Sequence, residues 1–179
     1  MISTIKKYSL LFGIAGVIIL FDQWTKALVR TNLSMGESWV PWEWLMPYAR
    51  IVHWTNTGVA FGMFQGFGKV FAILALIVIA IIIYYYPRVP SEEWPLRVAM
   101  GMQLGGATGN LIDRLVNNWE VTDFVSVGNF AVFNIADASI SVGVAVLLIG
   151  MWWKERLDAK QKALAGEPQD LAEQKESLE

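Results

Sequence analysis

Aspartates are the side chains of this 179-residue chain best suited to chemistry, because the other usual candidates are scarce. The chain has no cysteine and a single histidine, which excludes a thiol nucleophile and any metal site built on thiolates or several histidines. Of the six aspartates, Asp158 and Asp170 belong to a charged C-terminal stretch. The other four lie in or beside apolar segments, and they are Asp22, Asp113, Asp123 and Asp137. Acids at bilayer depth are energetically costly, so these four are candidates for function.

Asp123 and Asp137 have no basic neighbour in the sequence. Gly128-Asn129 separates two β-rich runs, and a two-residue hairpin turn there would place Asp123 opposite Asn134. Asn134 is suited to cap the following helix, with Asp137 one turn further on. Two close carboxyls share a proton, one acting as base and the other as acid. We therefore expect a pair that activates water against an amide, with no metal and no cofactor.

The alternative interpretation of the same two acids is structural. Asp123 would then be an ordinary loop acid, and Asp137 a first-turn acid stabilised by the helix dipole. The membrane context favours the catalytic pair, since both acids would lie in one layer of the membrane with Asp22 and Asp113.

Supporting roles are expected for the polar residues around the pair. Asp22 and Lys26 are four residues apart on one helix face, which predicts an ion pair that is structural or orients a substrate. Asp113 precedes Arg114, and Asn110 is four residues before Arg114, which predicts a hydrogen-bonded network holding this helix in place.

Two further catalytic options use other residue types. His53 is more simply a hydrogen-bonded surface group than a general base. Ser139 or Ser141 could form a serine–lysine dyad with Lys26, although serine in an apolar helix usually packs closely or bonds to the backbone.

The elements that must position these residues are membrane helices. The chain is 55% hydrophobic and 17% charged, whereas soluble domains have about 45–50% apolar and 25% charged residues. Spans of about 20 apolar residues are expected at 9–29, 70–86, 96–116 and 135–153. The third is rich in glycine and other small residues, which predicts that it packs in the middle of the bundle. The first is read as an uncleaved span rather than a signal peptide.

The distribution of lysine and arginine places both termini in the cytoplasm, with loops 30–69 and 117–134 outside. Most of the tryptophans then lie near a membrane interface, where they would act as anchors. Residues 50–54 alternate like a strand. The predicted fold is an all-α polytopic membrane protein with four transmembrane helices and a small extracytoplasmic β-structured platform. Residues 1–157 form one membrane domain, and 158–179 a charged cytoplasmic tail that is a frayed helix or disordered.

Five motifs in order resemble one known family, the lipoprotein signal peptidases (signal peptidase II), which are aspartic proteases of the bacterial inner membrane. The motifs are FDQWTK (Phe21–Lys26), TNTGVAFG (Thr55–Gly62), GGATGNLIDR (Gly105–Arg114), VTDF (Val121–Phe124) and FNIADASI (Phe133–Ile140). They extend from the first predicted span to the fourth, and the five together are very specific.

The resemblance implies that Asp123 and Asp137 are the catalytic pair. It also implies that the site is lined by residues that orient the substrate backbone, namely Asn56, Gly58, Asn110, Arg114 and Asn134, and is supported by Asp22 and Lys26. The substrates would be prolipoproteins carrying a diacylglyceryl-modified cysteine, cut on the amino side of that cysteine. The partners would be these substrates and membrane lipid, and no nucleic acid, since a net charge of −2 offers no basic surface.

Two other functions remain open at this point. Intramembrane acids also occur in proton pathways, so a small transporter is the main alternative, although a transporter needs polar groups at the midplane and access from both sides. A non-enzymatic scaffold would bind partners through interfacial aromatic side chains, and its function would survive aspartate-to-asparagine changes.

Overall fold

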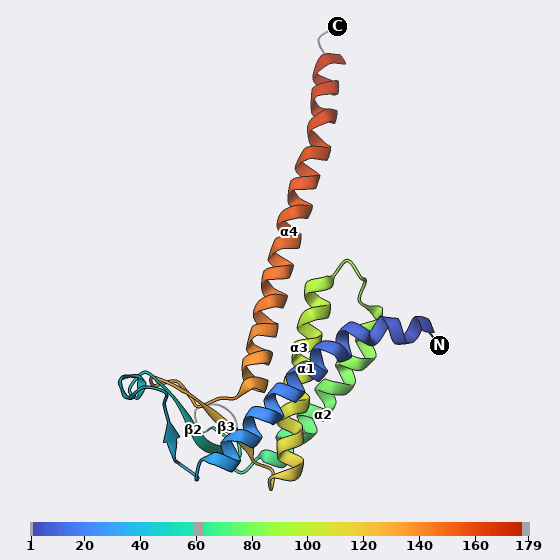
Figure 1. Cartoon of the computed structure of the whole chain (residues 1–179). Coiled ribbons are helices and arrows are strands. Elements are labelled where there is room, and N and C mark those ends of the chain that lie inside the picture. Colours follow the sequence, from blue (N-terminus) through green and yellow to red (C-terminus); the bar gives the residue numbers. More distant parts are fainter. Residues whose placement is uncertain (1, 59–62, 177–179) are drawn as a thin grey trace.

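Four helices form the body of the protein, with a small sheet at one end (Figure 1). The computed structural model describes the backbone of residues 2–58 and 63–176 and the side chains of residues 7–58 and 63–161. The helices are α1 (Ile2–Asn32), α2 (Gly68–Tyr85), α3 (Trp94–Val116) and α4 (Ile135–Glu176). Among the described residues, the connections contain the short 3-10 helices η1 (Glu43–Leu45) and η3 (Tyr86–Arg88).

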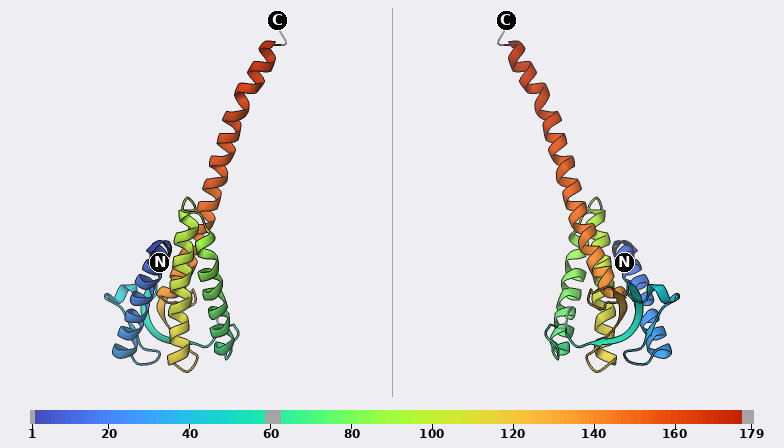
Figure 2. Two further views of the ribbon diagram at one scale, coloured as in Figure 1. Left: turned by 90° about the vertical axis from the view of Figure 1, so that its right-hand side faces the viewer. Right: turned by 90° about the vertical axis from the view of Figure 1, so that its left-hand side faces the viewer.

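Each of the four predicted spans coincides with one of these helices, and the second span also includes the first residue of η3. Three stretches of the described residues are long and apolar enough to cross a membrane, and they are Lys7–Asn32, Gly68–Arg88 and Ile135–Gln161. The helix α3 is less apolar than these three, yet its 23 residues extend about 34 Å at 1.5 Å per residue. Beyond the bundle, α4 continues as one helix to Glu176, so the segment expected to be frayed or disordered is helical over most of its length (Figure 2).

Glycines on α3 allow the other helices to pack closely against it, so α3 lies in the middle of the bundle as predicted. A Cβ atom on Gly101 would lie 3.0 Å from Cβ of Ile14, and one on Gly105 would lie 2.8 Å from Cβ of Ile18, both on α1. On an adjacent face of α3, a Cβ on Gly106 would lie 2.5 Å from the carbonyl oxygen of Ala136 on α4. The small residues therefore determine the distance between the helix backbones.

Gly106→Ala is expected to destabilise the protein by about 1–3 kcal/mol, because the new methyl group would push backbone against backbone and separate α3 from the first turn of α4. Gly13→Ala is the matched control, since its Cβ would meet nothing within 4 Å. Thermal unfolding in detergent should show a lower midpoint for Gly106→Ala alone. Equal midpoints for the two variants would mean that the close approach is not important for stability.

The sheet has three antiparallel strands in the order β1 (Ser38–Trp39), β2 (Ala49–Asn56) and β3 (Val121–Val127). The predicted strand at 50–54 is confirmed as the middle of β2. The pairing of β2 with β3 places Trp54 opposite Asp123 and Asn56 opposite Val121. It brings the loop before α2 to the loop before α4, which builds a platform beside the ends at which α1 and α3 finish and α2 and α4 begin (Figure 1).

The predicted hairpin around Gly128-Asn129 is wrong in its second arm. The turn exists, with Gly128 at a φ of +51°, but residues 130–134 form no strand and make only one bridge, Val125 with Phe133. That bridge is offset by one residue from the predicted register. The strand β3 takes β2 as its ladder partner instead, because β2 offers a long paired edge while the segment after the turn must lead directly into α4.

Candidate active site

Asp123 and Asp137 line one cavity of about 500 Å³ between β3, α3 and the start of α4. Its polar lining includes four more of the predicted site residues, and these are Asn56, Gly58, Asn110 and Arg114. Its apolar lining comes from the segment 130–133 after the turn and from residues 138, 140 and 142 of α4. The structure thus brings six residues of the sequence-predicted site together around one space. The other four, Asp22, Lys26, Asp113 and Asn134, are buried beside it.

Asn134 links the two acids. Its Nδ2 donates to Oδ1 of Asp123 at 2.7 Å, and its Oδ1 accepts the backbone N–H of Asp137 at 2.9 Å. Oδ2 of Asp137 accepts the backbone N–H of Asn134 at 3.3 Å, which completes a reciprocal cap at the start of α4. Both predicted features, the cap and the closeness of Asn134 to Asp123, are confirmed, although the predicted hairpin is not what produces them.

Two other asparagines each donate to one acid of the pair. Nδ2 of Asn110 donates to Oδ1 of Asp137 at 2.7 Å, and Nδ2 of Asn56 donates to Oδ2 of Asp123 at 3.3 Å. Each amide is held in this orientation by its oxygen, which accepts from Lys26 in Asn110 and from the backbone N–H of Gly58 in Asn56. Amide donors therefore surround both carboxyls, an arrangement that fixes their positions.

Burial raises the pKa of Asp123 to about 7, and the negative charge of Asp137 adds to this effect. Hydrogen bonds from Asn134 and Asn56 and the charge of Lys26 act in the opposite direction. Asp123 is only 2% exposed, so desolvation dominates. A carboxyl with this pKa gains or loses its proton when the pH changes slightly around neutrality, which suits it to proton transfer.

Asp123→Asn is expected to make the folded protein more stable at pH 8. Asp123 binds its proton more tightly when folded, so the stability of the parent protein falls as pH rises from about 4 to about 7 and is level above that. Asparagine does not titrate and removes this loss. The unfolding midpoint should therefore exceed that of the parent by about 5 °C at pH 8 and by little at about pH 4. A gap that is the same at both pH values would contradict the raised pKa.

A buried cluster of charges lies behind the pair. Nζ of Lys26 is 2.8 Å from Oδ2 of Asp22 and 3.4 Å from Oδ2 of Asp113, and all three side chains are completely buried. The predicted ion pair between Asp22 and Lys26 is thus confirmed. Nζ also donates to Oδ1 of Asn110 at 3.0 Å. Lys26 therefore bridges two acids and the amide that contacts Asp137.

Each acid of this cluster also accepts a backbone N–H next to one member of the pair. Asp113 accepts from Thr122 at 2.8 Å, and Asp22 accepts from Ala136 at 2.9 Å. The cluster on α1 and α3 therefore fixes β3 and α4 at the positions that precede Asp123 and Asp137.

The predicted network of Asp113, Arg114 and Asn110 is confirmed for the contact between Arg114 and Asn110, which uses the backbone oxygen of Asn110, but Asp113 is not part of it. The guanidinium of Arg114 donates to the backbone oxygens of Asn110 and Gly58, both at 3.4 Å, while Asp113 bonds to groups on α1 and β3. Successive residues on a helix point about 100° apart, so Asp113 faces the cluster and Arg114 faces the cavity. Nε of Arg114 is buried and has no acceptor among the described residues.

Gly58 follows Asn56 on a turn where a side chain would not fit. A Cβ there would collide with the backbone oxygen of Met63. The last four residues of the predicted motif Thr55–Gly62 lie outside the described residues.

Three residues of the cluster were not predicted from the sequence. Nε2 of Gln23 donates to Oδ1 of Asp113 at 3.2 Å, and Nη1 of Arg30 donates to Oγ1 of Thr122 at 3.0 Å. Gln23 and Arg30 share the helical face of Lys26, at spacings of three and four residues, and this periodicity was the available signal.

The serine and histidine options find no support in the hydrogen bonds of the described residues. Ser139 donates to the backbone oxygen of Ala136 at 2.8 Å, as serine in an apolar helix usually does. Nδ1 of His53 lies 2.9 Å from the backbone oxygen of Leu33, away from the cavity. Within the described part of the chain, no three acidic or histidine side chains are placed to hold a metal ion.

Comparisons with known proteins identify the family of the chain. Residues 14–153 match the family model described as signal peptidase (SPase) II. The lipoprotein signal peptidase of Bacillus subtilis is 42% identical over 146 residues, which cover 79% of this chain and 92% of that protein. The lipoprotein signal peptidase of Anoxybacillus flavithermus is 38% identical over 154 residues, which cover 82% and 88%. A solved structure described as a bacterial membrane enzyme superposes with a TM-score of 0.74 at 29% identity, over 81% of this chain and 88% of that one. The chain belongs to the signal peptidase II family.

Proposed function

We propose that Asp123 and Asp137 are the carboxyls with which this aspartic-protease-family enzyme removes signal peptides from prolipoproteins. The activity is that of the family to which the chain belongs. The observation that carries the residue assignment is the shared cavity, in which two buried acids lie close enough for one to raise the pKa of the other.

The mechanism follows from one proton shared by the pair. The ionised carboxyl takes a proton from a water molecule as its oxygen attacks the scissile carbonyl, and the protonated carboxyl donates its proton to the carbonyl oxygen. The tetrahedral intermediate then collapses, and a proton returns to the leaving amine as the C–N bond breaks. This scheme needs neither a thiol nor a covalent intermediate.

Polar groups around the cavity are suited to hold the peptide. Arg114 offers the buried Nε–H that has no acceptor among the described residues, and this donor can bind a substrate carbonyl. Asn56 and Asn110 keep the carboxyls in place. The lack of a side chain at Gly58 lets the turn after Asn56 pack against the backbone of Met63. The apolar side of the cavity, formed by residues 130–133 and α4, is suited to the apolar side chains of a signal peptide.

The finer substrate assignment is a diacylglyceryl-modified prolipoprotein, cut on the amino side of the lipidated cysteine. A lipid-bearing substrate can reach the cavity laterally while its acyl chains stay in the bilayer. This assignment is supported by the apolar wall of the cavity beside α4 and by the names of the relatives.

The proposed topology has four spans, because α3 also crosses the membrane together with the three more apolar helices α1, α2 and α4. Helices α1, α2 and α4 all pack against α3, so its polar and small residues need not face lipid. Both termini would be cytoplasmic, and the sheet and cavity would lie at the outer face of the bacterial inner membrane. Residues 1–157 would form the peptidase domain, with 158–179 as a cytoplasmic tail. Family membership does not favour the transporter alternative.

The test is cleavage of a diacylglyceryl-modified prolipoprotein by the purified protein in lipid nanodiscs, compared with the same polypeptide without the lipid. Mass spectrometry of both products gives the cut position. We expect cleavage of the lipidated form alone, immediately before the modified cysteine. Equal cleavage of the unlipidated form would overturn the substrate assignment, and cleavage elsewhere would overturn the assigned bond.

A further inference from the structure

The connection between β1 and β2 presents a cluster of exposed aromatic and apolar side chains. We call this cluster the aromatic tip, and its members are Trp39, Trp42, Trp44, Met46 and Tyr48. Trp44 is 67% exposed and Tyr48 is 66% exposed, and η1 within the tip has no buried residue. The rings of Trp42 and Trp44 stack on each other, with centroids 6.4 Å apart. The tip is therefore ordered, yet it is not packed into the protein's own core.

The chemistry of the tip matches one environment. Tryptophan and tyrosine carry a large apolar ring with one polar N–H or O–H group, and such side chains are enriched where a bilayer meets water. Between Trp39 and Tyr48 the only charged residue is Glu43. Exposed apolar patches of this kind on a water-facing surface mark an interaction site.

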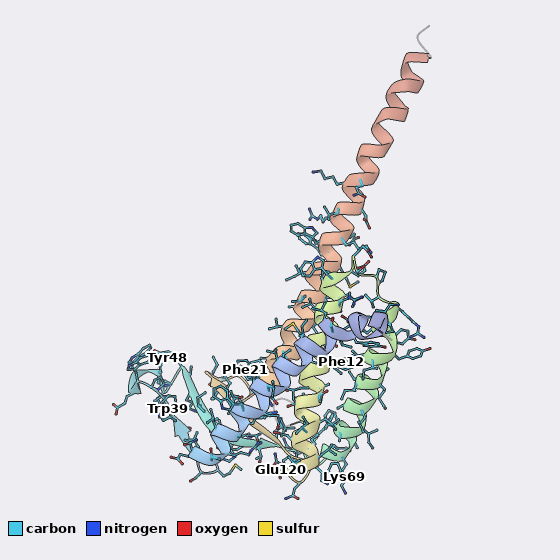
Figure 3. All side chains as sticks on the ribbon, turned by 45° about the vertical axis from the view of Figure 1, so that its right-hand side comes forward. Phe12, Phe21, Trp39, Tyr48, Lys69 and Glu120 are labelled. Atoms are coloured by element: carbon cyan, nitrogen blue, oxygen red, sulfur yellow. The ribbon has the colours of Figure 1, made fainter. Side chains whose placement is uncertain are left out.

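The position of the tip indicates lipid as the occupant. The tip does not extend beyond the ends of the helices but lies beside them, turned back toward the middle of the bundle (Figure 2). Trp39 and Tyr48 lie near the level of Phe21 on α1, while Lys69 and Glu120 lie at the end of the bundle (Figure 3). Phe21 is 55% exposed on a helix apolar enough to span a membrane, so its surroundings are lipid. The tip thus continues the lipid-facing surface of α1.

We propose that the aromatic tip inserts into the bilayer at the boundary between phospholipid headgroups and acyl chains, and so anchors the sheet to the membrane. The tip is joined to the site through the backbone. Tyr48 accepts the N–H of Gly128 at 2.8 Å, and the adjacent Ala49 pairs with Val127 at the end of β3. Since β2 carries Asn56 and β3 carries Asp123, anchoring the tip fixes the depth of the cavity relative to the lipid.

The absence of cysteine from the chain makes a direct test possible. Met46→Cys keeps every aromatic side chain of the tip and accepts a nitroxide spin label. In nanodiscs of phosphatidylethanolamine and phosphatidylglycerol, collisions with oxygen and with a water-soluble nickel chelate report lipid and water exposure. Phe21→Cys is the lipid control and Lys69→Cys the water control, because both native side chains are exposed.

The label at position 46 is expected to resemble the label at position 21, with oxygen favoured over the nickel chelate. A label as accessible to nickel as that at position 69 would overturn the proposal, and so would shielding from both reagents, which would indicate a protein contact. The accessibility of the label does not depend on cleavage, so failure of the lipid anchor is distinguishable from failure of the proposed activity, which is assayed on the same preparation.

A second variant tests the consequence for catalysis. Trp42→Ser combined with Trp44→Ser is expected to raise KM for a membrane-embedded substrate by about tenfold, equivalent to 1.4 kcal/mol, with kcat little changed. Trp152→Ser is the matched control, since Trp152 is similarly exposed but lies far along α4. An unchanged KM in the double variant, or an equal rise in the control, would contradict an anchoring role for the tip.

Discussion

Replacing either Asp123 or Asp137 by asparagine is expected to reduce signal-peptide cleavage by at least about 1000-fold. Asparagine preserves the size of the side chain and can still accept from Asn134 or Asn110. It cannot take a proton from water or give one to a carbonyl oxygen. The loss should therefore appear in kcat, with little effect on KM.

Single-turnover cleavage of a lipidated prolipoprotein in nanodiscs measures this effect. Asp158→Asn is the matched control, because Asp158 is an exposed aspartate on α4 far from the cavity. Unfolding midpoints of all three variants exclude misfolding as the cause of a loss. Cleavage at the parent rate by a folded Asp123→Asn or Asp137→Asn protein would remove that residue from the mechanism.

Lys26→Met should have the largest effect on stability. The substitution leaves the carboxylates of Asp22 and Asp113 buried without their shared cation, and breaking a buried ion pair in this way costs about 3–5 kcal/mol. It also removes the donor that orients the amide of Asn110 toward Asp137. We therefore expect a much lower unfolding midpoint and little cleavage activity.

The double change Asp22→Asn with Lys26→Met provides a matched test of this explanation. Asp113 would keep its contacts with Arg30, Gln23 and the backbone of Thr122, so one uncompensated charge is removed and part of the stability should return. Lys154→Met controls for the loss of a lysine from a helix, since Lys154 is exposed. A Lys26→Met protein as stable as Lys154→Met would show that the cluster is not important for folding.

The helices were predictable from the sequence because hydropathy and glycine content are local properties. The central position of α3 followed from its small residues, which the close contacts with Ile14, Ile18 and Ala136 confirm. The pairing of β2 with β3 was missed. The two strands are far apart in the sequence, since Asn56 and Asp123, whose side chains bond across them, are 67 positions apart, and the segment after Gly128 offered a nearer partner. Short strands specify their partners weakly, so tertiary packing determined that β3 pairs with β2 and not with the segment after Gly128.

The candidate site was predictable where its contacts are local. Asn134 and Asp137 are three residues apart, and the cap between them follows from residue type and spacing. The long-range contacts were not predictable from spacing. Asn110 was assigned to Arg114, but its side chain contacts Lys26, which is 84 positions away, and Asp137. The direction of a side chain within a crowded helix interface depends on which neighbour supplies a charge, and the sequence alone does not specify that neighbour.

The pH dependence of kcat/KM tests most directly whether a shared proton drives the reaction, because kcat/KM reports the ionisation of the free enzyme. The pKa of Asp123 is raised to about 7, so the pair keeps its proton below this pH and loses it above. The measurement is cleavage of the lipidated prolipoprotein in nanodiscs from pH 5.5 to about 9, with folding checked at each pH. We expect kcat/KM to fall about tenfold for each pH unit above about 7. A value that stays constant or rises between about pH 7 and 9 would contradict catalysis by a carboxyl pair that shares one proton.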